Sequence, residues 1–97
     1  MNVEFLPAAD EELNEAAAYY EERAPGLGED LLDEAQLGRD LLSLQPNIGL
    51  RLDALHRRLP LRRFPFGLIF RVDPDAVRIV AFAHNRRQPG YWRSRPR

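Results

Sequence analysis

The seven residues from Val77 to Ala83 place the tightest constraint on how this chain can fold. They read Val-Arg-Ile-Val-Ala-Phe-Ala, so a strand formed by them is apolar on both of its faces. Such a strand belongs in the interior of a sheet, with neighbours on either side, and not at an edge. The sequence therefore predicts a sheet with this segment at its centre, and the rest of the chain must supply the neighbours.

Two segments in the first half have the period of amphipathic helices, from about Pro7 to Arg23 and from about Glu29 to Leu44. An Ala-Pro-Gly-Leu-Gly break separates them, and Pro46 ends the second. So short a break predicts an αα-hairpin. Its apolar stripes are Leu13, Ala16, Ala17 and Tyr20, and then Leu31, Ala35, Gly38 and Leu42, widened by Leu32 and Leu41. Glycine in mid-helix costs about 1 kcal/mol against alanine, so Gly38 indicates close approach to another element.

Three further segments, of which His56–Phe64 is rich in arginine, supply the other strands. They cover Val3–Leu6, His56–Phe64 (with Pro60 favouring an edge or bulge) and Leu68–Val72, and residues 47–53 form a loop. Three consecutive strands with short connections predict an antiparallel meander. We expect a single α+β domain over residues 1–97, with an N-terminal strand, an αα-hairpin and a three-stranded meander. Its helices would pack on one face of the sheet.

Charge is segregated along the chain. Residues 1–50 contain twelve Asp and Glu but two Arg, whereas residues 51–97 contain twelve Arg and three Asp; there is no Lys. Such asymmetry predicts separate surfaces with separate partners. Six arginines lie on or beside the predicted strands, and we expect several on an open sheet face that binds phosphate or an acidic partner. They are Arg57, Arg58, Arg62, Arg63, Arg71 and Arg78, with Arg63 favoured over Arg62 for the open face.

The segment Ala83–Arg97 is rich in aromatic and guanidinium groups, which suits an anionic or π-rich partner. The predicted binding residues are Arg63, Arg71, Arg86, Arg87, Tyr91, Trp92 and Arg93. His84 is either a general base or a hydrogen-bonding cap of the strand. Trp92 either seats a partner or packs in the core. The acidic helix face (Glu11, Glu12, Glu15, Glu22) is expected to be solvated, and Asp73 and Asp75 to be turn residues.

Several classes of function find no support. The chain has no Cys, and its two histidines, His56 and His84, are far apart, so we expect no metal site and no cofactor. It has no glycine-rich phosphate loop. No apolar run approaches the roughly 20 residues of a membrane span, and the acidic start does not resemble a secretory signal. We therefore expect a cytoplasmic protein without a membrane partner.

The order of elements and several strings resemble the RelE/ParE toxins of bacterial type II toxin–antitoxin modules. The strings are the Ala/Glu-rich first helix ending in AYY, the LGEDLLDEAQ start of the second helix, RRLPLRRFPFGLIFRV and IVAFAHNRRQPGYWRSR. The resemblance spans nearly the whole chain. It implies the fold described above and a toxin neutralised by a cognate antitoxin, in a possible hetero-oligomer. The antitoxin would lay a helix and an acidic arm along the toxin.

The superfamily implies two alternative targets. RelE-like members cut mRNA on the ribosome and commonly use Lys and Arg, whereas ParE-like members inhibit DNA gyrase without chemistry of their own. This chain has no Lys, although His84, Arg86, Arg87 and Tyr91 are candidates for a RelE-like site. The PGYW ending is closer to ParE, so a gyrase inhibitor is favoured. An inactive module that only binds antitoxin is the third alternative.

Overall fold

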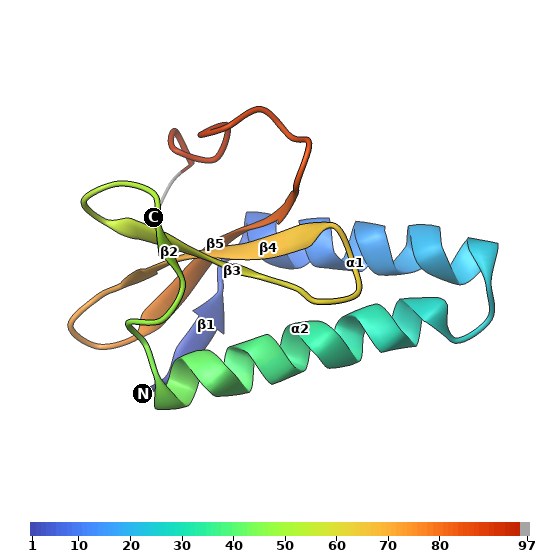
Figure 1. The fold of residues 1–97 in the computed structure, drawn as a ribbon, viewed down its shortest axis with the longest axis horizontal. Helices are drawn as coiled ribbons and strands as arrows, with labels where there is room; N and C mark the ends of the chain where they lie inside the picture. Colours follow the sequence, from blue (N-terminus) through green and yellow to red (C-terminus); the bar gives the residue numbers. More distant parts are fainter. Residues whose placement is uncertain (96–97) are drawn as a thin grey trace.

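The chain folds into a five-stranded sheet with a helix pair on one face (Figure 1). The computed structural model describes residues 1–95. The elements are β1 (Val3–Phe5), α1 (Pro7–Arg23), α2 (Leu27–Leu44), β2 (Leu50–Arg51), β3 (His56–Pro60), β4 (Phe66–Val72) and β5 (Val77–His84). The strand order is β1-β5-β4-β3-β2, with β1 parallel to β5 and the other pairs antiparallel. The α+β architecture predicted from sequence is confirmed.

Strand β5 has a neighbour on each side, as its apolar pattern predicts. It pairs with β1 over Val77–Ile79 and with β4 along its whole length. The β4–β5 register shifts at Ile69/Phe70, which is a β-bulge. As a result Val80 and Ala81 both pack on the face away from the helices, while Ile79 and Phe82 pack beneath them. One strand thus serves two apolar clusters.

The helix hairpin buries the stripes that its periodicity predicts. Leu13, Ala17, Leu31, Ala35 and Leu42 are buried, and Ala16 and Tyr20 pack partly exposed against them. Helix α2 starts two residues earlier than predicted, directly after Gly26, whose φ of 87° ends the connection. The expectation that Leu32 and Leu41 widen the buried stripe is wrong, because each is 39% exposed.

Two glycines allow the close packing of α2. A methyl group on Gly38 would lie 2.8 Å from Leu68 Cδ1, which confirms the predicted close approach. A methyl group on Gly28 would lie 2.4 Å from the Ala17 carbonyl oxygen, at the contact between the two helices. Since backbone cannot yield as a side chain can, Gly28 fixes how near α2 comes to α1.

The ends of β1, β4 and β5 differ from the sequence prediction by one or two residues, β4 beginning at Phe66 and not at Leu68, and two differences are larger. The strand predicted over His56–Phe64 ends at Pro60, because residues 61–65 form the tight connection into β4, which the Leu61 N–H closes by donating to the Phe66 carbonyl at 2.9 Å. Phe64 instead turns into the core and is 6% exposed. Leu50–Arg51, within the predicted loop, pairs with β3 as a short edge strand. Both differences arise at the sheet edge, where local patterning is weakest.

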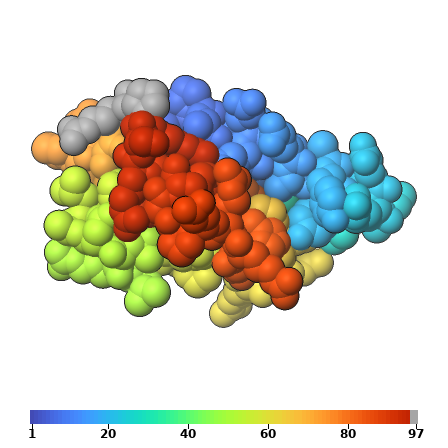
Figure 2. Space-filling model, turned by 90° about the horizontal axis from the view of Figure 1, so that it is seen from above, coloured from blue at the N-terminus to red at the C-terminus, as the bar shows by residue number. Residues whose placement is uncertain are grey.

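The face of the sheet away from the helices is not the open arginine surface that the sequence suggested. Residues 85–95 cross it and lie between the β2–β3 hairpin and α1 (Figure 2). Trp92 packs there with Ile69, Val80, Ala81 and Ala83. Because β5 is apolar on both faces, the face away from the helices must also be shielded from water, and the C-terminal segment shields it.

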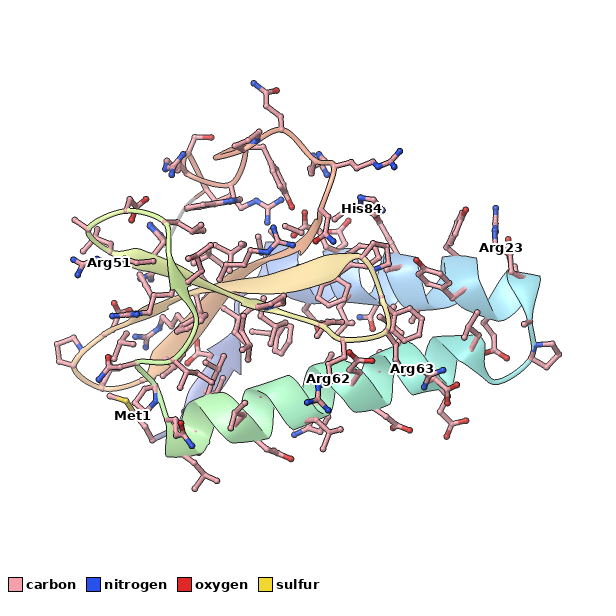
Figure 3. The ribbon with its side chains drawn as sticks, viewed as in Figure 1. Met1, Arg23, Arg51, Arg62, Arg63 and His84 are labelled. Carbon is pink, nitrogen blue, oxygen red and sulfur yellow. The ribbon has the colours of Figure 1, made fainter. Side chains whose placement is uncertain are left out.

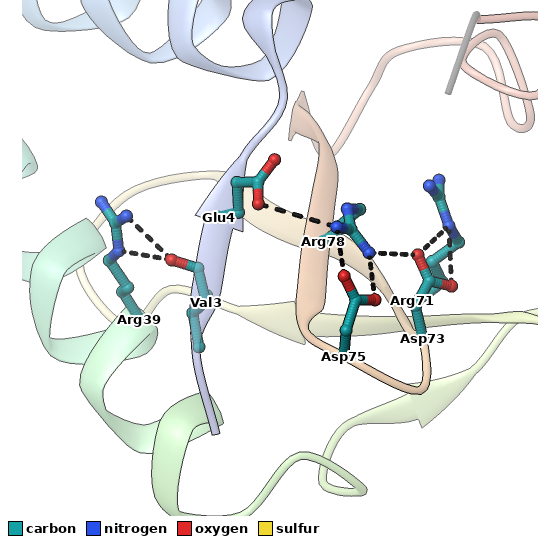
Figure 4. A network of polar contacts seen from close by, with 7 residues as sticks. All are labelled: Val3, Glu4, Arg39, Arg71, Asp73, Asp75 and Arg78. Carbon is teal, nitrogen blue, oxygen red and sulfur yellow. Dashed lines mark hydrogen bonds and ion pairs between the residues drawn. The ribbon is translucent and has the colours of Figure 1, made fainter.

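The remaining part of that face carries an ion-pair network (Figure 4). Arg78 donates to Asp73 at 2.9 Å and to Asp75 at 2.9 and 3.0 Å, and Arg71 Nε donates to Asp73 at 3.1 Å. Asp73 and Asp75 flank a turn, as predicted, and also neutralise these arginines. The Arg78 side chain lowers the pKa of Asp75 to about 2.

No helix in residues 1–95 is long and apolar enough to cross a membrane.

The substitution Gly28→Ala tests the helix contact. We expect it to lower the free energy of unfolding by about 1–3 kcal/mol, because the added methyl forces α1 and α2 apart. Urea unfolding followed by circular dichroism measures this. Gln36→Ala, on the exposed side of α2, is the control and should change little. Equal stability of Gly28→Ala and wild type would contradict the proposed close contact.

Candidate functional site

Glu12, on the first half of α1, holds the C-terminal segment in place. Its Oε2 accepts a bond from the Tyr91 hydroxyl at 2.6 Å, and its carboxylate takes both Arg95 Nη atoms at 2.8 Å each. Its Oε1 also accepts the Phe82 N–H at 3.1 Å. The expectation that Glu12 is solvated is wrong, whereas Glu11, Glu15 and Glu22 are exposed.

The Glu12–Arg95 pair completes the edge of the sheet. Strand β1 ends at Phe5, opposite Ile79, so β5 has no strand neighbour on that side beyond this point. There the Val80 carbonyl accepts from Arg95 Nη1 at 2.9 Å, and the Phe82 N–H donates to Glu12. The pair therefore satisfies backbone groups that a longer β1 would have bonded.

These contacts determine whether the Glu12 carboxyl and the Tyr91 hydroxyl carry a proton. Burial alone would raise the pKa of Glu12, but hydrogen bonds from Arg95, Tyr91 and Phe82 hold it below its usual value. Burial and the bond to Glu12 raise the pKa of Tyr91 to about 12. Near neutral pH, Glu12 is ionised and Tyr91 is a neutral donor, so the Tyr91 hydroxyl is occupied structurally.

Asp53, in the turn between β2 and β3, forms the second anchor. Its carboxylate accepts the Leu55 and His56 N–H groups at 2.8 and 2.7 Å and Arg93 Nε at 3.1 Å, and lies 3.0 Å from His56 Nδ1. Against the cost of desolvation, these bonds hold the pKa of Asp53 well below its usual range. The His56 ring lies 4.5 Å from the Trp92 ring. Sequence reasoning missed both Glu12 and Asp53.

The C-terminal residues predicted as functional surround a hollow of about 380 Å³. Its lining brings together His84, Arg87, Tyr91, Trp92 and Arg93, while Arg86 is not part of it. His84 Nδ1 accepts the Arg86 N–H at 3.0 Å, which is the capping role considered for it. Arg87 stacks on Tyr91 at 3.9 Å. Trp92 is 5% exposed, so the structure shows its core role.

The remaining predicted binding arginines do not converge on that hollow. Arg63 lies beside α2 (Figure 3), where it pairs with Asp30 at 3.4 Å and is largely exposed. Arg71 is engaged by Asp73 at 3.1 Å. A binding role for each stays a prediction. Within residues 1–95, His, Asp and Glu form no cluster of three suited to a metal ion.

A leucine groove between α2 and β3 is the main exposed apolar feature. Leu37, Leu41 and Leu44 are 68%, 39% and 81% exposed and recur at i, i+4 and i+7 on α2. A hollow of about 290 Å³ lies between Leu37 and Leu41 on α2 and Leu59 and Pro60 of β3. We define the leucine groove by its lining residues, which are Glu34, Leu37, Gly38, Leu41, Leu59, Pro60, Leu61 and Arg62. Of Leu37, Leu41 and Leu44, the sequence prediction included only Leu41, which it wrongly placed on the buried stripe; Leu37 and Leu44 were not singled out.

The substitution Glu12→Gln tests the anchor. We expect a loss of about 1–3 kcal/mol in unfolding free energy at pH 7, because the Arg95 charge loses its partner. Since the folded-state pKa of Glu12 is depressed, its contribution is complete above its ordinary pKa near 4.5 and is lost as pH falls through the lowered value. The difference from wild type should therefore shrink in acid.

Urea unfolding at pH 7 and pH 3, followed by fluorescence of the single tryptophan, measures this difference. Glu11→Gln is the matched control, since Glu11 is exposed on the same turn. A difference that is absent at pH 7, or that stays constant down to pH 3, would contradict the anchor.

Residues 3–89 match the family described as the ParE toxin of type II toxin-antitoxin system, parDE. No curated protein sequence matches. A solved structure described as the chromosomal ParDE TA system from P. aeruginosa is similar, with a TM-score of 0.78 and 20% identity over 87% of this chain and 95% of that chain. At this identity the likeness shows the fold alone. Because the family match covers most of the sequence, this chain belongs to the ParE toxin family of type II toxin–antitoxin systems.

Proposed function

We propose that this chain is a toxin that a cognate antitoxin neutralises and that inhibits DNA gyrase by binding, without chemistry of its own. Membership of the ParE family is the observation that carries the proposal. The toxin and antitoxin would form a hetero-oligomer in the cytoplasm. Two features of the structure support this proposal. The leucine groove supports antitoxin binding, and the hydrogen-bonded side chains of the C-terminal segment support inhibition without catalysis.

The leucine groove supports the antitoxin half. Leu37 and Leu41 project from one helix beside Leu59 of β3, and the spacing i, i+4 suits an apolar helix laid along α2. Glu34 and Arg62 stand at its rim and offer both charges for orientation. An apolar stripe of this kind costs free energy when it faces water, so a partner that covers it gains affinity.

The C-terminal side chains support inhibition without catalysis. A RelE-like nuclease needs a base, an acid and cations arranged around one phosphate. Here the Tyr91 hydroxyl is held by Glu12, His84 Nδ1 is bonded to the Arg86 N–H, and Arg86 is outside the hollow. These engagements disfavour the mRNA-cleaving alternative, although they do not bear on which protein is bound.

Pulse labelling tests the target. The chain is induced in cells that lack the antitoxin, and thymidine and methionine incorporation are followed over the first minutes. We expect DNA synthesis to fail before protein synthesis. Earlier failure of protein synthesis would instead favour ribosomal mRNA cleavage, and no effect on either would indicate an inactive module that only binds antitoxin.

The double substitution Leu37→Glu/Leu41→Glu tests the leucine groove. We expect the affinity for the cognate antitoxin to fall at least about tenfold, as for other buried interface anchors, while circular dichroism stays unchanged. The control is Leu55→Glu, because Leu55 is 63% exposed on the β2–β3 turn, away from the groove. Unchanged affinity by calorimetry in the double variant would place the antitoxin elsewhere.

A further inference from the structure

Two arginines face each other across the edge of the sheet. Arg51 of β2 and Arg57 of β3 are register partners, so their side chains leave the same face of adjacent strands. Directly opposed residues have Cβ atoms only about 5 Å apart, and like charges in such a position destabilise the pairing. A two-residue strand has few other contacts with which to offset this repulsion. The pairing of two arginines at this position therefore suggests that another group offsets their repulsion.

Neither arginine has an acidic partner within residues 1–95 of the structure. Arg63, Arg71, Arg78, Arg93 and Arg95 each form an ion pair within 4 Å, but Arg51 and Arg57 form none. Arg51 Nε reaches only the Asp53 carbonyl, and Arg57 Nη1 only the Gly49 carbonyl, both at 3.4 Å. Such long bonds leave most of the guanidinium donors of both residues available.

Both side chains border one small hollow at this end of the molecule. It measures about 190 Å³, and Asn47 lines it together with Arg51, Arg57 and Arg71, while Phe70 and Val72 supply apolar surface. Asp53 also borders it, but its carboxylate is engaged by Arg93 and His56. Arg71 is likewise neutralised by Asp73. The positive charge that remains uncompensated in the hollow is that of Arg51 and Arg57.

We propose that Arg51 and Arg57 form a phosphate-binding site. A phosphate group presents tetrahedrally arranged oxygens, so two guanidinium groups on adjacent strands can each bond to different oxygens. Its negative charge removes the cross-strand repulsion, which links binding to stability. The Asn47 amide provides a further donor. The phosphate is either free or part of a nucleic-acid backbone, and the site does not depend on the gyrase proposal.

Thermal unfolding in sodium phosphate and in sodium chloride, at equal ionic strength, tests the site. We expect phosphate to raise the Tm of wild type by about 4 °C or more relative to chloride. Arg57→Gln should have a higher Tm than wild type in chloride, because the repulsion is gone, and its Tm should rise much less in phosphate than that of wild type. Arg51→Gln should behave in the same way.

The matched control is Arg62→Gln, which removes one exposed positive charge outside the hollow and should keep the full response. Phosphate also stabilises proteins generally by exclusion from their surface, and that effect is the same in all variants. Equal phosphate responses in wild type and both hollow variants would overturn the proposal, as would loss of the response in Arg62→Gln.

Binding of a fluorescent 12-base-pair DNA duplex identifies the source of the phosphate. About tenfold weaker anisotropy-detected binding in Arg57→Gln, with Arg62→Gln unchanged, assigns the site to a nucleic-acid backbone. Equal DNA binding in all variants, with the phosphate response confined to Arg51 and Arg57, assigns it to free phosphate. Both measurements use the purified chain, so they are independent of whether it is toxic.

Discussion

The central strand β5 is longer than its neighbour β1. Where β1 ends, the Glu12–Arg95 ion pair bonds to the backbone of β5 in its place. Strand β1 stops at Phe5, but β5 continues to His84. Glu12 and Arg95 bond the backbone of Phe82 and Val80 at the uncovered edge. Because Tyr91 binds the same carboxylate, the C-terminal segment is held over the second apolar face. The two-sided core of β5 thus depends on one glutamate from the helix layer.

Much of the fold follows from periodicity alone. The two-sided apolar run predicted β5, and the helical stripes predicted the hairpin, because both patterns report burial directly. Glu12 could not be predicted in this way. It stands beside Glu11 in an acidic stretch, and only the packing of α1 against β5 decides which carboxylate turns inward. The two-residue β2 likewise owes its structure to its partner β3 and not to its own residues.

The segregated charges meet again in the folded protein. Glu12 and Asp30 from the acidic half pair with Arg95 and Arg63 from the basic half. The sequence predicted separate acidic and basic surfaces. In the folded protein such surfaces can be formed only by charged side chains that have no partner of opposite charge. On the helix layer those are exposed acids of α1, and at the sheet edge they include the opposed arginines of β2 and β3. We expect binding partners at these unpaired charged side chains.

Hydrogen exchange of the Phe82 amide tests the role of Glu12 most directly. This N–H has no strand partner and is bonded to a side chain carboxylate. We predict slow exchange in wild type, comparable to that of amides within the β4–β5 ladder, and much faster exchange when Glu12 is replaced by alanine, which removes the acceptor. Fast exchange of Phe82 in the wild-type protein, or protection that survives the replacement, would contradict the view that Glu12 closes the sheet.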